Sequence, residues 1–327
     1  MNLTLLVSSA GRRVELINCF RKDAKALGIA LRVLAADRDP AMSAACQVAD
    51  ASFAVPRCDA PDFIPALREI CRREKVDLLV PTIDPELRPL AEARDAFTAA
   101  GTRVVVSNPA TVVLARDKLR TAAFLVQAGL PAPRSAPLAD WLADEVALRF
   151  PVILKRLDGS SSIGLHEAHD AMAVRRLDLD VPRYLAQEKW SGREYTVNVF
   201  FDQAGRLRAA VPHERCATRA GEVSKGRTER LPRLMELAGR LGAALDGAQG
   251  PLCFQAIVTA DGEAVIFEIN ARFGGGFPLA HQAGAPFTRW LLEEAMGRES
   301  TADDNWQAGV TMLRYDAAVF LAAEDGR

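Results

Sequence analysis

The sequence predicts an α/β fold followed by an α+β region, because the pattern of strands and helices changes near residue 108. In the first third, short β-branched runs alternate with amphipathic helical patterns, which is typical of a doubly wound parallel sheet. From residue 151 onward, longer strands follow one another with few helices between them, which favours antiparallel pairing. We therefore expect a Rossmann-like parallel sheet followed by antiparallel sheets.

In the first third, the predicted strands are LTLLV, LRVLAAD, DLLVPT and TRVVVS, and the predicted helices cover residues 14–27, 62–74 and 86–99. The first turn reads SSAGRR and lacks G-x-G-x-x-G, so dinucleotide binding is not expected. Ligands of such sheets bind at the carboxyl ends of the strands. Arg12 and Glu86 lie at such ends and are candidate substrate contacts, with cap or turn residues as the alternative.

The next segment begins with Asn108 as an expected helix N-cap and ends at Gly129 and Pro131. Beyond it, the predicted strands are PVILK, YLAQEKW, EYTVNVFF, RLRAAVPHER, PLCFQAIVTA and EAVIFEINA. Residues 216–230 are polar and contain glycine, and we expect a mobile loop there. The expected domains are 1–108, 109–191 and 192–327.

Composition and charge exclude some classes of function and partner. The chain has 327 residues, 49% of them hydrophobic, and a formal net charge of −1, so neither a nucleic-acid track nor a membrane surface is expected as a partner. The N-terminal apolar run is too short for a signal peptide, which favours a cytoplasmic protein. The six cysteines lack metal-site spacing and are expected to be reduced.

The segment PVILKRLDGSSSIGL predicts a phosphate site. A strand delivers Lys155 and then passes into a loop bounded by Gly159 and Gly164. Backbone amides and hydroxyls of such a loop can surround phosphate oxygens, while the lysine supplies a positive charge. The alternative is a flexible connection between two strands.

The segment AQEKWSGREYTVNV predicts a nucleoside site. Its backbone beside Trp190 could pair with an adenine edge, and Glu194 could accept hydrogen bonds from ribose hydroxyls. A strand with surface ion pairs is the alternative.

The segment FEINARFGGG predicts a metal site. Glu268 and Asn270 are two apart on a strand and therefore share a face, as does Arg272 if the strand continues. With Gln255 on the preceding strand, they form a set of oxygen ligands suited to Mg²⁺. Side chains facing water are the alternative, although the strand is otherwise apolar.

These segments, together with RDKLRTAAFLVQAGLP and in this order, resemble the nucleotide site of the ATP-grasp superfamily. The resemblance is closest to carboxylate–amine ligases similar to carbamoyl phosphate synthase and to the ligase of pyrrolysine biosynthesis. LLVSSAGRRVELI and VPTIDPEL resemble the Rossmann-like domain that precedes the ATP-grasp lobes in those proteins. The resemblance thus implies a pre-ATP-grasp domain followed by a two-lobed ATP-grasp fold with antiparallel sheets.

The resemblance also implies roles for individual residues. Phosphates would be bound by Lys118, Lys155 and the loop residues Gly159, Ser160, Ser161, Ser162 and Gly164; the nucleoside by Glu188, Lys189, Trp190 and Glu194; the metal by Gln255, Glu268 and Asn270. Arg272 would stabilise the transferring phosphoryl group, and Lys155 would assist it.

The function implied is ATP-dependent activation of a small-molecule carboxylate as an acyl phosphate, with Mg²⁺ (Mn²⁺ as the alternative), followed by attack of an amine or a similar nucleophile. ADP and phosphate would be released, and a homodimer is one expected assembly. Arg215, Arg219 and Lys225, in the expected loop, are candidates to hold the carboxylate. Alternatives are a kinase on the same scaffold and a nucleotide-binding module without catalysis.

Overall fold

A computed structural model describes residues 2–144, 146–157 and 164–321. The loop residues Gly159, Ser160, Ser161 and Ser162 lie outside the described residues. The chain forms two compact units. Unit 1 comprises residues 1–106, 286–301 and 313–327, and unit 2 comprises residues 107–285 and 302–312.

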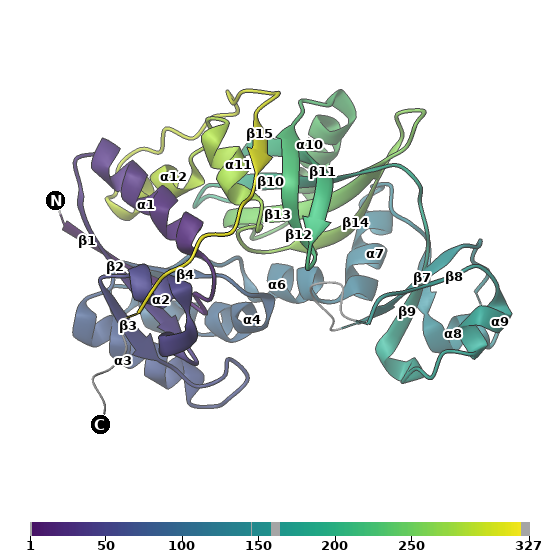
Figure 1. Ribbon diagram of the computed structural model, residues 1–327, viewed down its shortest axis with the longest axis horizontal. Coiled ribbons are helices and arrows are strands. Elements are labelled where there is room, and N and C mark those ends of the chain that lie inside the picture. Colours follow the sequence, from purple (N-terminus) through teal and green to yellow (C-terminus); the bar gives the residue numbers. More distant parts are fainter. Residues whose placement is uncertain (1, 145, 158–163, 322–327) are drawn as a thin grey trace. The chain divides into compact units, whose positions relative to one another are not determined.

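Unit 1 is built on a five-stranded parallel sheet of order β3-β2-β1-β4-β5 (Figure 1). The strands are β1 (Asn2–Ser8), β2 (Ala30–Asp37), β3 (Ala51–Ala54), β4 (Leu78–Pro81) and β5 (Arg103–Val104). Leu5, Leu6 and Val7 in the central strand are fully buried, as expected for a sheet covered on both faces. The predicted parallel α/β fold is confirmed.

The helices of unit 1 include one from late in the sequence. They are α1 (Val14–Ala26), η1 (Pro40–Met42), α2 (Ala44–Val48), α3 (Phe63–Glu74), α4 (Asp84–Glu92), α5 (Arg94–Thr98) and α12 (Phe287–Ala295). Helix α12 packs on α1, where Thr288 donates a hydrogen bond to buried Asp23. The expected boundaries had grouped this helix with residues 192–327, but its apolar residues Trp290 and Leu291 are buried in unit 1.

In unit 2, a small antiparallel sheet has the order β6-β9-β7-β8. Its strands are β6 (Ser135–Pro137), β7 (Val152–Arg156), β8 (His166–Ala168) and β9 (Tyr184–Glu188), and it is accompanied by α8 (Leu138–Leu142), α9 (Ala171–Arg175) and η2 (Val181–Arg183). One face packs Val152, Leu154 and Ala186 against Trp141 of α8. The alternation of side chains along a strand therefore turns Lys155 and Gln187 to the other face.

A larger sheet completes unit 2, with the order β14-β13-β10-β11-β12-β15. Its strands are β10 (Arg193–Phe201), β11 (Leu207–Arg219), β12 (Glu222–Thr228), β13 (Gly250–Val258), β14 (Ala264–Asn270) and β15 (Thr311–Leu313). Pairing is antiparallel from β14 through β12, which confirms the predicted antiparallel region.

The remaining helices of unit 2 are α6 (Pro109–Arg116), α7 (Lys118–Gln127), α10 (Pro232–Ala244) and α11 (Phe277–Gln282). Asn108 caps α6 by accepting from the Thr111 amide, as expected. Asp117 ends α6 and caps α7 by accepting from the amides of Leu119 and Arg120, so the single expected helix is two. Lys118 thereby stands at the first position of α7. In the part of the chain that the structure describes, no helix combines the length and the apolar character needed to cross a membrane.

The expectation of a mobile loop at residues 216–230 is wrong. Strand β11 continues to Arg219, Ala220 and Gly221 form a two-residue turn with φ of 49° and 77°, and β12 returns along β11. Positive φ at both turn positions suits the type I′ hairpin turn, whose twist matches that of the strands. Exposed Lys225 and Arg227 alternate with buried Gly226 and Thr228, which identifies a strand with one solvent face.

Candidate functional site

Lys155 is held by two contacts in unit 2. It lies on β7, and its ammonium donates a hydrogen bond to Gln187 Oε1 of β9 at 2.7 Å. The same nitrogen lies 4.8 Å from the centre of the Phe267 ring on β14. A cation over an aromatic face is attracted by the ring electrons. The small and large sheets of unit 2 therefore meet at this lysine.

Hydrogen bonds fix the orientation of the Gln187 amide. Its Nε2 donates to Ser135 Oγ at 2.9 Å, and Ser135 Oγ donates to the Pro133 carbonyl at 3.1 Å. A serine hydroxyl has a single proton, so Ser135 must accept from Gln187. The oxygen end of the amide consequently faces Lys155. Sequence reasoning missed Gln187 because it stands next to Glu188 in a strand where every residue is buried.

Charges from three other elements act on Lys155. Burial lowers the pKa of Lys155 to about 8, Glu268 opposes this lowering, Lys118 adds to it, and Glu194 opposes it again. These residues come from β14, α7 and β10, respectively. The fold thus brings together four residues that the sequence had assigned to phosphate, ribose and metal binding.

A β-bulge explains how Phe267 reaches the lysine. Gln255 of β13 pairs with Glu268, whereas the next residue, Ala256, pairs with Ile266, so Phe267 is an extra residue on β14. Such an insertion bends the strand and changes the direction of a side chain. Strict alternation would have turned Phe267 away from the face that carries Glu268.

The three predicted metal ligands lie together. Gln255 and Glu268 are cross-strand partners, and Asn270 Nδ2 donates to Glu268 Oε1 at 3.1 Å. Arg272 donates to Asn270 Oδ1 at 3.3 Å. The oxygen atoms of this set fit Mg²⁺, although only Glu268 brings a formal charge. No group of three or more His, Cys, Asp and Glu side chains suited to a metal occurs among the described residues.

A buried polar row continues across the same face of the large sheet. Gln255 pairs with Thr196, which pairs with His213, and Cys253 next to them pairs with Asn198. Asn198 and His213 are fully buried, with Asn198 Nδ2 lying 3.2 Å from His213 Nδ1. The sequence signal for this row was Thr196 and Asn198, two apart within an apolar strand. They were not among the predicted residues.

The three glycines after Arg272 are explained by these side chains. A Cβ on Gly276 would lie 2.6 Å from His213 Nε2, one on Gly274 would lie 3.0 Å from Asn198 Oδ1, and one on Gly275 would overlap the Glu222 carboxylate. In the structure, side chains of β10, β11 and β12 fill that space.

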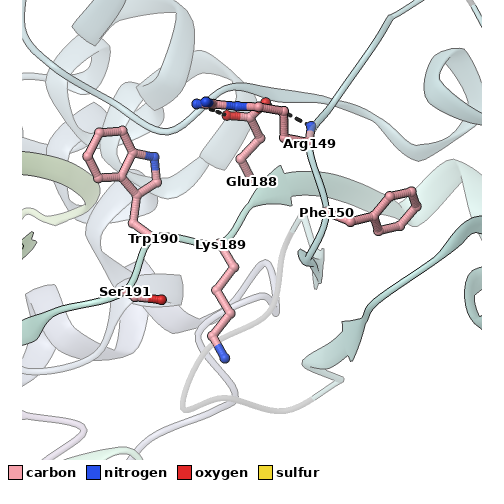
Figure 2. A pocket seen from close by; sticks show the side chains of 6 residues that line it. All are labelled: Arg149, Phe150, Glu188, Lys189, Trp190 and Ser191. Atoms are coloured by element: carbon pink, nitrogen blue, oxygen red, sulfur yellow. Dashed lines mark hydrogen bonds and ion pairs between the residues drawn. The ribbon is translucent and has the colours of Figure 1, made fainter.

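The segment Lys189–Ser191 joins β9 to β10 and lines a hollow of about 370 Å³ together with Arg149, Phe150 and Glu188 (Figure 2). Glu188 is buried and accepts from the Arg149 amide at 2.9 Å and from its guanidinium at 3.4 Å. Lys189 points away from that pair (Figure 2). Its ammonium donates to Glu167 at 2.7 Å. The Glu188 carboxylate is thus bound to Arg149, and the Lys189 amide donates to the Pro151 carbonyl.

Gly192 sets the position of this joining segment. A Cβ there would lie 2.2 Å from the Val258 carbonyl oxygen, which is backbone of β13 and cannot move aside cheaply. We expect Gly192→Ala to lower the free energy of unfolding by about 1–3 kcal/mol, as for other overpacked sites. Chemical denaturation would measure the change. Gly239→Ala, on helix α10 with open space at Cβ, is the control and should be neutral or stabilising; equal stability of the two variants would contradict the packing.

The candidate carboxylate contacts separate in the structure. Arg215 is largely buried, with Nε 2.8 Å from Glu194 Oε1, whereas Arg219 and Lys225 are exposed. In unit 1, Arg12 is exposed and Glu86 is fully buried.

Glu86 has a structural role. Its carboxylate accepts from the amides of Thr82 at 2.7 Å and Ile83 at 3.1 Å and from Ser9 Oγ at 2.9 Å. It is the third residue of α4 and caps that helix. Burial raises the pKa of Glu86, while these hydrogen bonds oppose the rise. The alternative interpretation of Glu86 as a cap is therefore the one that the structure supports.

A parallel sheet followed by two antiparallel sheets, with lysine, glutamate and asparagine side chains gathered on the latter, defines an ATP-grasp architecture. The model of the PylC-like N-terminal domain matches residues 5–105, and that of the ATP-grasp domain "in the biosynthetic pathway with Ter operon" matches residues 180–317. The chain therefore carries a PylC-like N-terminal domain and an ATP-grasp domain.

Curated relatives match part of the chain. A D-alanine–D-alanine ligase of Ectopseudomonas mendocina is 32% identical over 174 residues, which cover 48% of this chain and 55% of the relative. A carbamoyl-phosphate synthase of Methanobrevibacter smithii is 28% identical over 155 residues, covering 46% of this chain and 41% of the relative. The chain spans about half the length of the curated relatives it matches.

Solved structures share the fold over almost the whole chain. Biotin carboxylase from Campylobacter jejuni superposes with a TM-score of 0.72 at 17% identity. The superposition covers 93% of this chain and 73% of the biotin carboxylase chain. An L-amino acid ligase from Bacillus licheniformis has a TM-score of 0.69 at 19% identity, and the superposition covers 92% of this chain and 76% of the ligase chain. At these identities the likeness shows the fold.

Proposed function

We propose that this protein is an ATP-dependent ligase that activates a carboxylate as an acyl phosphate and passes the acyl group to an amine or a similar nucleophile. The observation that carries the proposal is the convergence of Lys155, Lys118, Glu194 and Glu268 within unit 2. Positive charges beside a carboxylate–amide oxygen set form a site for a triphosphate and its metal ion. The ligases among the curated relatives agree with this class of reaction.

Each residue set has a part in the proposal. Lys155 and Lys118 bind phosphate oxygens, and Glu194 accepts from the ribose. The segment Lys189–Ser191 holds the adenine, and the regions 109–191 and 192–285 act as the two lobes around the nucleotide. Gln255, Glu268 and Asn270 would hold Mg²⁺, which neutralises phosphate charge when bound. Arg272 is tied to Asn270 and stabilises charge on the transferring phosphoryl group.

The proposed reaction has two steps. A carboxylate oxygen of the substrate attacks the γ-phosphorus, a C–O–P linkage forms, and the bond to the β-phosphate oxygen breaks to leave ADP. The amine nitrogen then attacks the acyl carbon, phosphate leaves with its oxygen, and the amine proton passes to solvent. Both steps develop negative charge on phosphate oxygens, which the lysines and Arg272 would stabilise. Arg219 and Lys225 of unit 2 remain the proposed contacts for the carboxylate, with Arg12 of unit 1 as the alternative, whereas Arg215 is engaged with Glu194.

The test is the release of products from ATP across a panel of amino acids and sugar acids, each paired with amines. A ligase releases ADP and phosphate in equal amounts, and both require the carboxylate. ADP without phosphate would indicate a kinase that retains a phosphorylated product. Absence of ADP formation across the whole panel, with ATP still bound in calorimetry, would indicate a nucleotide-binding module.

The lowered pKa of Lys155 predicts how ATP binding depends on pH. With a pKa of about 8, the free protein carries a charged Lys155 below that pH and loses the charge above it. Phosphates favour the charged form, so the dissociation constant for ATP should rise above pH 8, by up to about tenfold per pH unit. Calorimetry from about pH 7 to about pH 9 would measure it.

Lys155→Arg is the control for this pH dependence, because a guanidinium remains charged throughout the range. Its dissociation constant should stay level above pH 8. An equal rise in both proteins would assign the titration to another group.

A further inference from the structure

A buried arginine lies beside the proposed ribose ligand. The Arg215 side chain on β11 is only 9% exposed, and its Nε lies 2.8 Å from Glu194 Oε1 in an ion pair. One terminal nitrogen donates to Thr196 Oγ1 at 3.3 Å and the other donates to the Gly221 carbonyl at 2.9 Å. Three contacts from β10 and the hairpin turn therefore hold this guanidinium in place.

The Glu194 carboxylate requires a contact of this kind to stay in one orientation. It is the second residue of β10, directly after the irregular segment that joins the two sheets, and its side chain is 40% exposed. An exposed glutamate carboxylate samples several rotamers, and ordering a side chain costs conformational entropy. The ion pair with Arg215 engages Oε1 and thereby restricts the positions that the Glu194 carboxylate can take.

We propose that Arg215 is a positioning residue that orients the Glu194 carboxylate for the ribose hydroxyls, and so sets the preference for ATP over 2′-deoxy-ATP. The inference rests on the proposed use of ATP and adds the residue that determines sugar selectivity. A site built to accept hydrogen bonds from substrate hydroxyls discriminates against the analogue that lacks one, because the bound nucleotide covers the acceptor and then leaves it unpaired. The discrimination is lost when the acceptor is free to rotate.

The experiment compares kcat/KM for ATP and for 2′-deoxy-ATP. We expect the wild-type ratio to exceed about tenfold, and Arg215→Met to reduce it to within about threefold of unity. At saturating ATP, kcat of Arg215→Met should change much less than the ratio, since Arg215 does not touch the reacting atoms. Glu194→Gln should lower the ratio as well, and the double variant should be no lower than Glu194→Gln alone, because the two residues act as one unit.

Arg227→Met is the matched control. Arg227 lies on β12 of the same hairpin, is 55% exposed and pairs with Glu229 at 3.1 Å, so its removal should leave the ratio unchanged. Arg215→Lys keeps a charge but loses the planar fork and should give an intermediate ratio, and it serves as the test if Arg215→Met does not fold.

The inference and the proposed function can fail separately. If no carboxylate supports turnover, dissociation constants for ATP and 2′-deoxy-ATP replace kcat/KM in every comparison. A wild-type protein that binds or uses both nucleotides equally well overturns the inference and leaves the ligase proposal standing. A wild-type ratio retained in both Arg215 variants overturns it too.

Discussion

Glu268→Gln is expected to keep the fold and to lose nearly all turnover. Glutamine preserves the size of the side chain and an oxygen that can accept from Asn270, so the β13–β14 pairing should survive. The lost charge is the single formal charge among Gln255, Glu268 and Asn270, and divalent-ion sites depend on it. It also opposes the lowering of the Lys155 pKa, so phosphate binding should weaken as well.

ADP release during a Mg²⁺ titration would measure this effect. We expect a loss of more than about tenfold in turnover and a shift of the titration to higher Mg²⁺. Glu263→Gln is the control, because Glu263 is exposed just before β14 and pairs with Arg233 away from the proposed ligands. Turnover of Glu268→Gln within about threefold of wild type would remove Glu268 from the proposed metal site.

Lys155→Ala is expected to weaken ATP binding by about 1.5–3 kcal/mol, the usual worth of a charged hydrogen bond, which corresponds to about 10–150-fold. The lysine contacts both sheets of unit 2 through Gln187 and Phe267, so its loss removes the proposed phosphate contact and a link between the sheets. The Michaelis constant of the acceptor should move far less than that of ATP.

Calorimetry with ATP and kinetics with varied acceptor would separate the two effects. Lys25→Ala, at an exposed position of α1 in unit 1, should leave both unchanged. Unchanged ATP affinity in Lys155→Ala, or a larger change for the acceptor, would contradict the assignment of Lys155 to phosphate.

Most of what the sequence predicted correctly rests on the alternation of side chains along strands. It correctly placed Glu268 and Asn270 on one face of a strand beside Gln255, and it predicted both kinds of sheet. It could not predict the bulge that turns Phe267 toward Lys155, because a bulge depends on pairing with another strand. The role of Gln187 could not be predicted for a similar reason, since it depends on contacts with Ser135 and Lys155 on neighbouring strands.

The charged hairpin shows a second limit of the sequence. The glycines of residues 216–230 favoured a loop, yet Gly221 completes a tight turn and Gly226 lies buried opposite Arg215 in the ladder. Arginine and lysine at exposed strand positions do not by themselves produce an alternation of apolar and polar residues, so the composition of this segment favoured a loop. The pairing of β12 with β11 is a tertiary feature that local composition does not encode.

The course of the chain restricts how the protein can be divided. It passes between the two units after residues 106, 285, 301 and 312. A fragment ending at residue 108 would lack α12, would expose the surface of α1 that packs on it, and would lose the hydrogen bond from Thr288 to Asp23. Swapping the N-terminal region between related proteins would therefore succeed only if residues 286–301 were exchanged with it, and the two segments should be inherited together.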